Sequence, residues 1–308
     1  MTDRRPILIA GPTASGKSAL ALALAERLGG AIINADSMQV YAELRILTAR
    51  PAEAELARAP HALYGHVPAS QAYSAGRFIT DAAAAIAETS GRGQTPILVG
   101  GTGLYFSALL EGLSPIPPAD ADARAYWRKE ARRLGAGHLH AILGDRDAAM
   151  AARLAPNDAQ RIVRALEILD TTGRSLATWQ QERAAPVVDP TTAVRLVLNP
   201  DRAVLHARAD ARFDAMLEAG ALGEAATLAG LGLDPTLPAM RAIGVGPLIA
   251  AARGEKDLDA ATAAAKAETR RYIKRQQTWL RRRMIAWNSI ETNEMECSVA
   301  SAIAFIES

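Results

Sequence analysis

Short apolar runs alternate along the chain with alanine-rich and amphipathic stretches. The apolar runs that have the length of buried strands are residues 7–10, 31–35, 95–99 and 192–199. Between and after them, helices are predicted at residues 19–28, at 76–88 and from Ala203 onward, where the chain finishes with helices. Because strands that alternate with helices build parallel sheets covered on both faces, the pattern predicts an α/β protein with a doubly wound parallel sheet.

The composition of the chain changes at residues 114–122, where the sequence SPIPPADAD is rich in proline and acidic residues. Such a segment is typical of a hinge. The pattern that follows is helical and includes a helix at residues 158–171, with Asn157 as its cap and Gly173 as its end. We therefore expect a core domain of residues 1–115 and 190–308, interrupted by a helical insertion of residues 116–189.

The first strand leads into a glycine-rich motif with the spacing G-x-x-x-x-G-K-[ST]. Its residues are Gly11, Pro12, Thr13, Ala14, Ser15, Gly16, Lys17 and Ser18. A strand before the motif and a helix after it distinguish a phosphate loop from an ordinary strand-turn-helix with surface glycines, and they indicate a P-loop NTPase-like core. Backbone N–H groups would surround phosphate oxygens, Lys17 would contact the terminal phosphate, and the Ser18 hydroxyl would help to hold Mg²⁺.

Two further strand ends face the same crevice as the phosphate loop, because ligands of parallel sheets bind beyond the carboxyl ends of the strands. Asp36 follows the second strand and could bind Mg²⁺ through water, accept a proton, or only cap a turn with Ser37. The third strand ends in Gly100-Gly101-Thr102, so the acid with which an ATPase holds its metal is absent there. The Thr102 hydroxyl could meet a substrate or serve only in the turn.

The charge of the chain is distributed unevenly. Residues 266–285 carry eight Lys or Arg and one Glu, a local charge of +7, whereas the whole chain has only +2 and the remainder therefore −5. A basic stripe on a mildly acidic protein indicates a polyanionic partner. The segment is predicted to be an amphipathic helix, on which Ile273, Leu280 and Met284 form the apolar stripe. Gln277 is expected on the basic stripe. Tyr272 and Trp279 could pack against the protein or stack on bases.

Other features of the composition exclude several classes of protein. No stretch approaches 18 consecutive apolar residues and the N-terminus leads directly into the first strand, so we expect a cytoplasmic protein with no membrane span. A single cysteine, Cys297, cannot form a disulfide framework, and the five histidines have no spacing typical of metal ligands. We expect the chain to act as a monomer.

Taken together, the motifs resemble those of the bacterial tRNA dimethylallyltransferases, also called tRNA isopentenyltransferases. The matching stretches are GPTASGKS (11–18), ADSMQVY (35–41), YSAGRF (73–78), PILVGGTGLY (96–105), QRIVRALEI (160–168), AMRAIG (239–244) and TRRYIKRQQTWLR (269–281). Their order and spacing over nearly the whole chain make the resemblance specific. The chain departs from the family pattern at residues 47–51, which read LTARP where the family more often has GTAKP. It also departs at residues 61–65, which read HALYG where the family commonly has HHLID. We assign no role to this loop.

The resemblance implies transfer of a dimethylallyl group from dimethylallyl diphosphate to the exocyclic amine of the adenosine 3′-adjacent to the anticodon. The phosphate loop would then hold a diphosphate leaving group rather than ATP, with Lys17, Asp36 and Thr102 as catalytic residues and Asp36 as the base. The adenine of that adenosine would leave the base stack of the tRNA to reach the site. By the resemblance, the residues that contact tRNA are Asp36, Ser37, Met38, Gln39, Thr102, Arg124, Gln160, Arg161, Ile162, Val163 and Arg164.

Two other functions fit parts of the pattern. A small-molecule or nucleoside kinase would share the phosphate loop and use Asp36 as the base for a hydroxyl, with the arginine-rich residues 124–133 as a lid. A non-catalytic RNA-binding module would retain the phosphate loop as a relic. ATP dependence and the effect of replacing Asp36 separate these alternatives from prenyl transfer.

Overall fold

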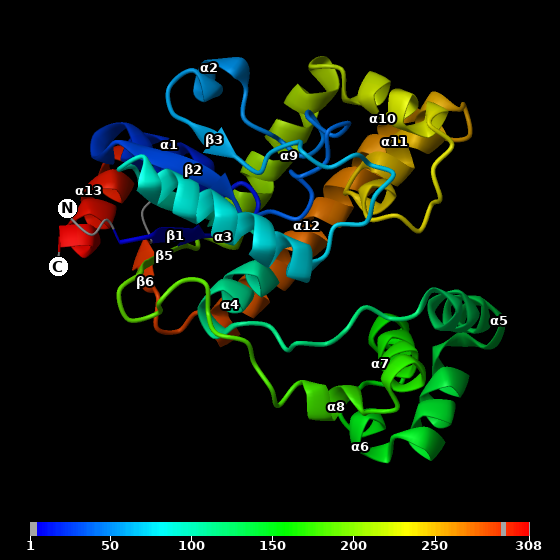
Figure 1. Ribbon diagram of the computed structural model, residues 1–308. Helices are drawn as coiled ribbons and strands as arrows, with labels where there is room; N and C mark the ends of the chain where they lie inside the picture. The colour runs from blue at the N-terminus through cyan, green and yellow to red at the C-terminus, as the bar shows by residue number, and fades with distance from the viewer. Residues whose placement is uncertain (1–4, 291–293, 308) are drawn as a thin grey trace. The chain divides into compact units, whose positions relative to one another are not determined.

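The computed structural model describes residues 5–290 and 294–307, and its contacts divide the chain into two compact units (Figure 1). Within the described residues, one unit comprises residues 5–110, 187–290 and 294–307, and the other is Glu111–Pro186. The expected core domain also included residues 1–4, 291–293 and 308, which lie outside the described residues. Each unit is considered by itself below.

A parallel sheet forms the centre of the larger unit. Its strands are β1 (Ile7–Ala10), β2 (Gly30–Asn34), β3 (His61–Ala62), β4 (Thr95–Gly100), β5 (Val194–Leu198) and β6 (Asn288–Ile290). Within the described residues they form a six-stranded sheet in the order β3-β2-β4-β1-β5-β6, with every pair parallel. The predicted parallel α/β fold is confirmed, because the four apolar runs of the sequence are the four central strands.

Helices cover both faces of this sheet, because alternate residues of each strand point to opposite sides (Figure 1). The helices of this unit are α1 (Lys17–Leu28), α2 (Glu53–Leu56), α3 (Ala75–Gly91), α4 (Gly103–Glu111), α9 (Arg202–Glu218), α10 (Ala221–Gly230), η1 (Ala239–Arg241), α11 (Val245–Ala252), α12 (Leu258–Arg283) and α13 (Met295–Glu307). Ile7 and Ile9 of β1 pack with α1 and α13, whereas Leu8 packs on the face covered by α3, α4 and α12.

The prediction that the chain finishes with helices alone is wrong. After α12 the chain returns to the sheet edge, where β6 pairs with β5 before α13 begins. Both edge strands escaped detection because β3 is only two residues long and β6 only three, too short for a hydrophobic period. Among the described residues, no helix is both long enough and apolar enough to cross a membrane.

The smaller unit is built from helices around its own apolar core. It contains α5 (Ala121–Arg146), α6 (Ala148–Ala151), α7 (Ala159–Thr172) and α8 (Leu176–Trp179). Helix α5 bends at Gly135, whose φ of 76° is not helical. The cap of α7 is Asp158 rather than the expected Asn157, because the Asp158 side chain accepts a hydrogen bond from the Arg161 backbone N–H, and Gly173 ends the helix as predicted.

Candidate functional site

The candidate site lies at the carboxyl edge of the sheet, where β2, β4 and β1 are neighbours. The chain leaves β1 into the phosphate loop (residues 11–18), β2 into residues 35–39 and β4 into residues 100–103. The last two segments are in direct contact, because the Ser37 backbone N–H donates to Thr102 Oγ1 at 3.0 Å. The Thr102 hydroxyl also donates to Ser37 Oγ at 3.3 Å. Thr102 therefore fixes the segment that carries Asp36.

The phosphate loop has the backbone geometry that an anion site requires. Gly16 has φ +90° and Ala14 φ +66°, so the chain turns through the left-handed region before α1 begins at Lys17. Gly11 is equally constrained, since a Cβ there would lie 2.6 Å from Ser15 Oγ and 2.9 Å from the Leu198 carbonyl oxygen. The first N–H groups of α1 have no partner within the helix and lie at the positive end of its dipole.

Two cations converge beside this loop. Lys17 Nζ donates to the Pro12 carbonyl oxygen at 3.2 Å, and burial lowers the pKa of Lys17 to about 8, opposed by the charge of Asp36 and reinforced by Arg212. Burial also lowers the pKa of Arg212, while Asp36 opposes that shift. Arg212, on α9, lines both the hollow at the phosphate loop and the cavity that contains Asp36. The sequence analysis missed Arg212, which belongs to no motif.

Gln276 of α12 links the phosphate loop to the turn after β4. Its Oε1 accepts from the Thr13 backbone N–H at 2.9 Å, and its Nε2 donates to the Gly101 carbonyl oxygen at 3.1 Å. A Cβ at Gly101 would lie 2.4 Å from Gln276 Nε2, so a side chain there would displace the Gln276 amide. The sequence offered one signal that we did not use: a pair of glutamines, Gln276 and Gln277, interrupts the run of basic residues.

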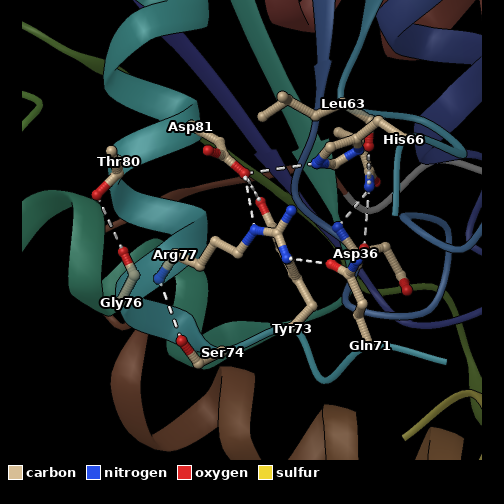
Figure 2. Close-up of polar contacts among 11 residues, drawn as sticks. Asp36, Leu63, His66, Gln71, Tyr73, Ser74, Gly76, Arg77, Thr80 and Asp81 are labelled. Carbon is tan, nitrogen blue, oxygen red and sulfur yellow. Dashed lines mark hydrogen bonds and ion pairs between the residues drawn. The ribbon is translucent and has the colours of Figure 1, made fainter. Parts of the chain in front are cut away.

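Asp36 is held by its backbone and by one carboxylate oxygen. Its N–H donates to Asn34 Oδ1 at 2.8 Å, and Asn34 Nδ2 donates to the carbonyl oxygens of Asp36 and Leu63, both at 3.0 Å (Figure 2). Asp36 Oδ1 accepts from the Met38 N–H at 2.9 Å. Asp36 thus caps a turn, as one interpretation held. Its other oxygen, Oδ2, would lie 3.4 Å from a Cβ at Gly101, so the carboxylate also faces the turn after β4.

A cavity of about 250 Å³ opens beside Asp36. Its polar lining residues are Thr13, Asp36, Ser37, Thr48, Arg212, Arg241, Thr269, Tyr272 and Arg275, and its apolar lining residues are Met38, Leu47, Ala209, Phe213, Met216, Ala242 and Ile243. Burial and then the charge of Asp36 raise the pKa of Tyr272, so its hydroxyl stays protonated. A ligand that carries both a charged group and a compact hydrocarbon group matches this mixed lining.

The YSAGRF stretch has a structural role beside the site. Ser74 caps α3 by accepting from the Arg77 N–H, and the Tyr73 hydroxyl donates to Asp81 Oδ2 at 2.8 Å (Figure 2). His66 Nε2 and Arg77 Nε lie 3.5 and 3.9 Å from the same oxygen. These contacts connect His66, in the loop after β3, and Tyr73 to α3.

The predicted RNA-contacting residues of the helical unit are of two kinds. Ile162 and Val163 are buried in the core of that unit. Arg161 is exposed and pairs with Asp158, and Arg164 Nη1 lies 3.5 Å from Glu167. Gln160 is exposed and Arg124 is half-buried near the start of α5. The polar members of the set, rather than Ile162 and Val163, present side chains to solvent.

Helix α12 has the predicted apolar stripe, with Ile273, Leu280 and Met284 buried. Two of its cations are neutralised by α9: Lys266 donates to Asp214 and Arg270 to Asp210, each at 2.7 Å. The exposed basic residues are Arg271, Lys274, Arg275, Arg281, Arg282 and Arg283.

The expected place of Gln277 among these cations is wrong. Its side chain is buried, where its Nε2 donates to Asn199 Oδ1 at 3.1 Å. Trp279 packs, since its ring would lie 2.3 Å from a Cβ at Gly103. Tyr272, in contrast, lines the cavity.

Comparison with known proteins shows the family to which the chain belongs. A model described as IPP transferase matches residues 39–283, and one described as isopentenyl transferase matches residues 5–64. The chain belongs to the IPP transferase family. Members similar to it include a tRNA dimethylallyltransferase of Parvibaculum lavamentivorans, 55% identical over 98% of this chain and 96% of that one. Another tRNA dimethylallyltransferase, from Bradyrhizobium sp. (strain ORS 278), is 52% identical over 94% of this chain and 95% of that one.

Solved structures of the family share the fold and confirm the P-loop NTPase-like architecture. A tRNA isopentenylpyrophosphate transferase from Bacillus halodurans superposes with a TM-score of 0.70 at 32% identity, covering 99% of this chain and 97% of that one. A eukaryotic dimethylallyltransferase, described as acting on tRNA, gives a TM-score of 0.81 at 28% identity, covering 99% and 80%. Family membership agrees with the resemblance that the sequence motifs showed.

Proposed function

We propose that this chain is a tRNA dimethylallyltransferase, which moves a dimethylallyl group from dimethylallyl diphosphate to the exocyclic amine of the adenosine 3′-adjacent to the anticodon. The observation that carries the proposal is the placement of Asp36 on one cavity with Arg212 and a set of apolar side chains, beside the phosphate loop. A carboxylate, a cation and a hydrocarbon-lined space are the groups that this reaction requires in one place.

The phosphate loop binds the leaving group. As the C–O bond of the donor breaks, the diphosphate departs with the electron pair, and negative charge develops on its bridging oxygen. Ala14, residues 16–18 and Arg212 line the hollow at this loop, and their backbone N–H groups, the Lys17 ammonium and the Arg212 guanidinium would stabilise that charge. Stabilising the departing group lowers the barrier more than it strengthens ground-state binding.

Asp36 serves the acceptor. An adenine amine is a weak nucleophile because its lone pair is delocalised into the ring. As nitrogen bonds to the allylic carbon, the carboxylate of Asp36 takes the proton that nitrogen loses. Thr102 acts one step away, by holding the Ser37 N–H and so the segment that carries Asp36. The adenine leaves its stack to reach the cavity, which Tyr272 lines.

The residues present fit a Mg²⁺ ion that arrives with the donor. Mg²⁺ usually keeps several waters and takes only one or two protein oxygens besides substrate phosphates. The Ser18 hydroxyl, exposed in the first turn of α1, is such a ligand, and within residues 5–290 and 294–307 no group of three His, Cys, Asp or Glu side chains forms a cage. When bound, Mg²⁺ neutralises charge on the diphosphate.

The partner of the basic surfaces is tRNA. We assign the anticodon stem-loop to the helical unit Glu111–Pro186, through the polar residues Arg124, Gln160, Arg161 and Arg164, and backbone phosphates to the exposed cations of α12. We also propose that the protein works as a monomer in the cytoplasm, where unmodified tRNA is available.

Prenyl transfer without ATP is the test of this function. The purified protein, mixed with Mg²⁺, unmodified tRNA and dimethylallyl diphosphate, is expected to add one dimethylallyl group to the adenosine beside the anticodon. Mass spectrometry of the digested nucleosides measures the product. Adding ATP should not increase it. Phosphorylation of a nucleoside by ATP, or RNA binding with no alkylated product, would contradict the proposal in favour of a kinase or a binding module.

The lowered pKa of Lys17 gives donor binding a particular pH dependence. Below its pKa of about 8, Lys17 is already charged and the dissociation constant of dimethylallyl diphosphate should be nearly constant. Above that pH, binding must take up a proton, so the dissociation constant should rise by up to about tenfold per pH unit. Titration calorimetry between pH 7 and 10 measures it. The matched variant Lys17→Arg remains charged throughout and should give a flat profile; an equal rise in both proteins would contradict the assignment.

A further inference from the structure

The loop from Arg45 to Ala49, to which the sequence analysis assigned no role, forms one wall of the cavity. Leu47 and Thr48 both line the cavity. Leu47 is 9% exposed and belongs to the main apolar core of the larger unit. The loop has no regular secondary structure, so its shape depends on what holds its backbone.

One carboxylate holds three consecutive backbone N–H groups of this loop. Glu224 Oε2 accepts from Arg45 N and Ile46 N, both at 2.7 Å, and Glu224 Oε1 accepts from Leu47 N at 2.8 Å. Glu224 lies in the first turn of α10, where the helix dipole favours a negative charge. Three charge-assisted hydrogen bonds to successive peptide groups fix the course of the loop more firmly than a contact with one side chain could.

A second side chain holds the carbonyl groups of the same loop. Gln39 Nε2 donates to the carbonyl oxygens of Thr48 at 2.9 Å and of Ala49 at 2.8 Å. Ala49 has φ +52°, an unfavourable conformation for alanine that persists because its surroundings impose it. The loop is thus fixed through its N–H groups by Glu224 and through its C=O groups by Gln39.

The position of Leu47 is closely adjusted to its neighbours in the cavity wall. A Cβ at Gly244 would lie 3.0 Å from Phe213 Cε2 and 3.4 Å from Leu47 Cδ2, so these side chains close over a glycine with φ +86°. Phe213 and Met216 of α9 continue the same apolar surface. Moving the Leu47 backbone would therefore open the wall against which a short hydrocarbon chain packs.

We propose that Glu224 is a positioning residue for the isoprenoid donor: by holding the N–H groups of residues 45–47, it sets the place of Leu47 in the wall that receives the dimethylallyl group. The inference rests on the proposed function. The wall is assigned to the donor because Leu47, Phe213 and Met216 are apolar and uncharged, as suits a branched five-carbon chain rather than the polar edge of an adenine.

Steady-state kinetics of Glu224→Gln test the role. The amide has nearly the size of the carboxylate but offers one acceptor oxygen, and its NH₂ group would face a backbone donor. The KM for dimethylallyl diphosphate should rise about tenfold, the loss expected when a charged hydrogen bond is broken. The kcat should change less than the donor KM, and the KM for tRNA should stay unchanged.

The matched control is Glu53→Gln. Glu53 lies 3.6 Å from the Arg45 side chain, so this variant removes a carboxylate next to the same loop without touching its backbone. It should match the wild type in all three constants. Wild-type protein that transfers no prenyl group would refute the proposed function itself, and the inference with it. With an active wild type, an unchanged donor KM in Glu224→Gln, or a rise in the tRNA KM alone, would overturn the inference only.

A second variant covers the case in which Glu224→Gln fails to fold. Leu47→Ala shortens the wall and leaves the hold of Glu224 on the backbone in place. Its KM for dimethylallyl diphosphate should also rise about tenfold, while its discrimination against a ten-carbon geranyl donor should weaken because the space is larger. Unchanged donor KM and unchanged selectivity in Leu47→Ala would overturn the assignment of this wall to the donor.

Discussion

Replacing Asp36 by Asn should lower the single-turnover rate of prenyl transfer by about 10² to 10⁴-fold, the usual contribution of a general base. The amide cannot take the proton of the adenine amine. Its oxygen can still accept the hydrogen bond from the Met38 N–H that Asp36 Oδ1 receives, so the turn should keep its shape. The rate is measured with enzyme in excess over labelled tRNA at saturating donor, and tRNA binding, measured by filter retention, should change less than about twofold.

Asp36→Ala serves as the comparison for this variant. It removes the base and the cap of the turn together, so any further loss beyond that of Asp36→Asn reports what the turn contributes. Near-normal transfer by Asp36→Asn would remove Asp36 as the base. Loss of tRNA binding in the Asn variant would instead give Asp36 a role in recognition of RNA.

Arg212→Met should lower kcat/KM for dimethylallyl diphosphate by about 10² to 10³-fold. Other enzymes lose about this much when one group that stabilises the developing charge is removed. The reason is the location of this guanidinium, which lines both the hollow at the phosphate loop and the cavity with Asp36. Methionine keeps an apolar stem and removes the guanidinium, with both its charge and its N–H donors. Initial rates over a range of donor concentrations measure the effect.

Arg208 is the matched control for Arg212, because it lies one helical turn earlier on α9, lines the phosphate-loop hollow and is more exposed. Arg208→Met should cost less than about tenfold, since solvent screens an exposed charge. Equal effects of the two variants would mean that Arg212 contributes only to the general positive potential, and that the departing diphosphate receives no specific contact from it.

The sequence allowed the centre of the fold to be predicted because its strands are buried on both faces. Strands β1, β2, β4 and β5 consist almost entirely of apolar residues, and such runs are visible without any knowledge of their neighbours. The edge strands β3 and β6 gave no such signal. Their pairing depends on the position of the sheet, which no local pattern of two or three residues encodes.

The site was predictable where the chain itself brings its parts together and not where distant segments meet. The phosphate loop lies within eight consecutive residues and carries its own spacing rule. Gln276, in contrast, reaches Thr13 across 263 positions, and Glu224 reaches Leu47 across 177. Arg212 sits among ordinary helix residues. Only the packing of α9, α10 and α12 around the sheet gives these three side chains a place in the site.

The link that Gln276 forms gives α12 a mechanical part in the enzyme. Helix α12 exposes arginines to solvent on one side. Through the side-chain amide of Gln276, the same helix connects the turn after β1 to the turn after β4. A rotation of α12 would therefore move both turns. Under the proposed function, nucleic acid bound to the exposed arginines of α12 would be coupled through Gln276 to the phosphate loop, and by reciprocity a filled phosphate loop would change nucleic-acid binding.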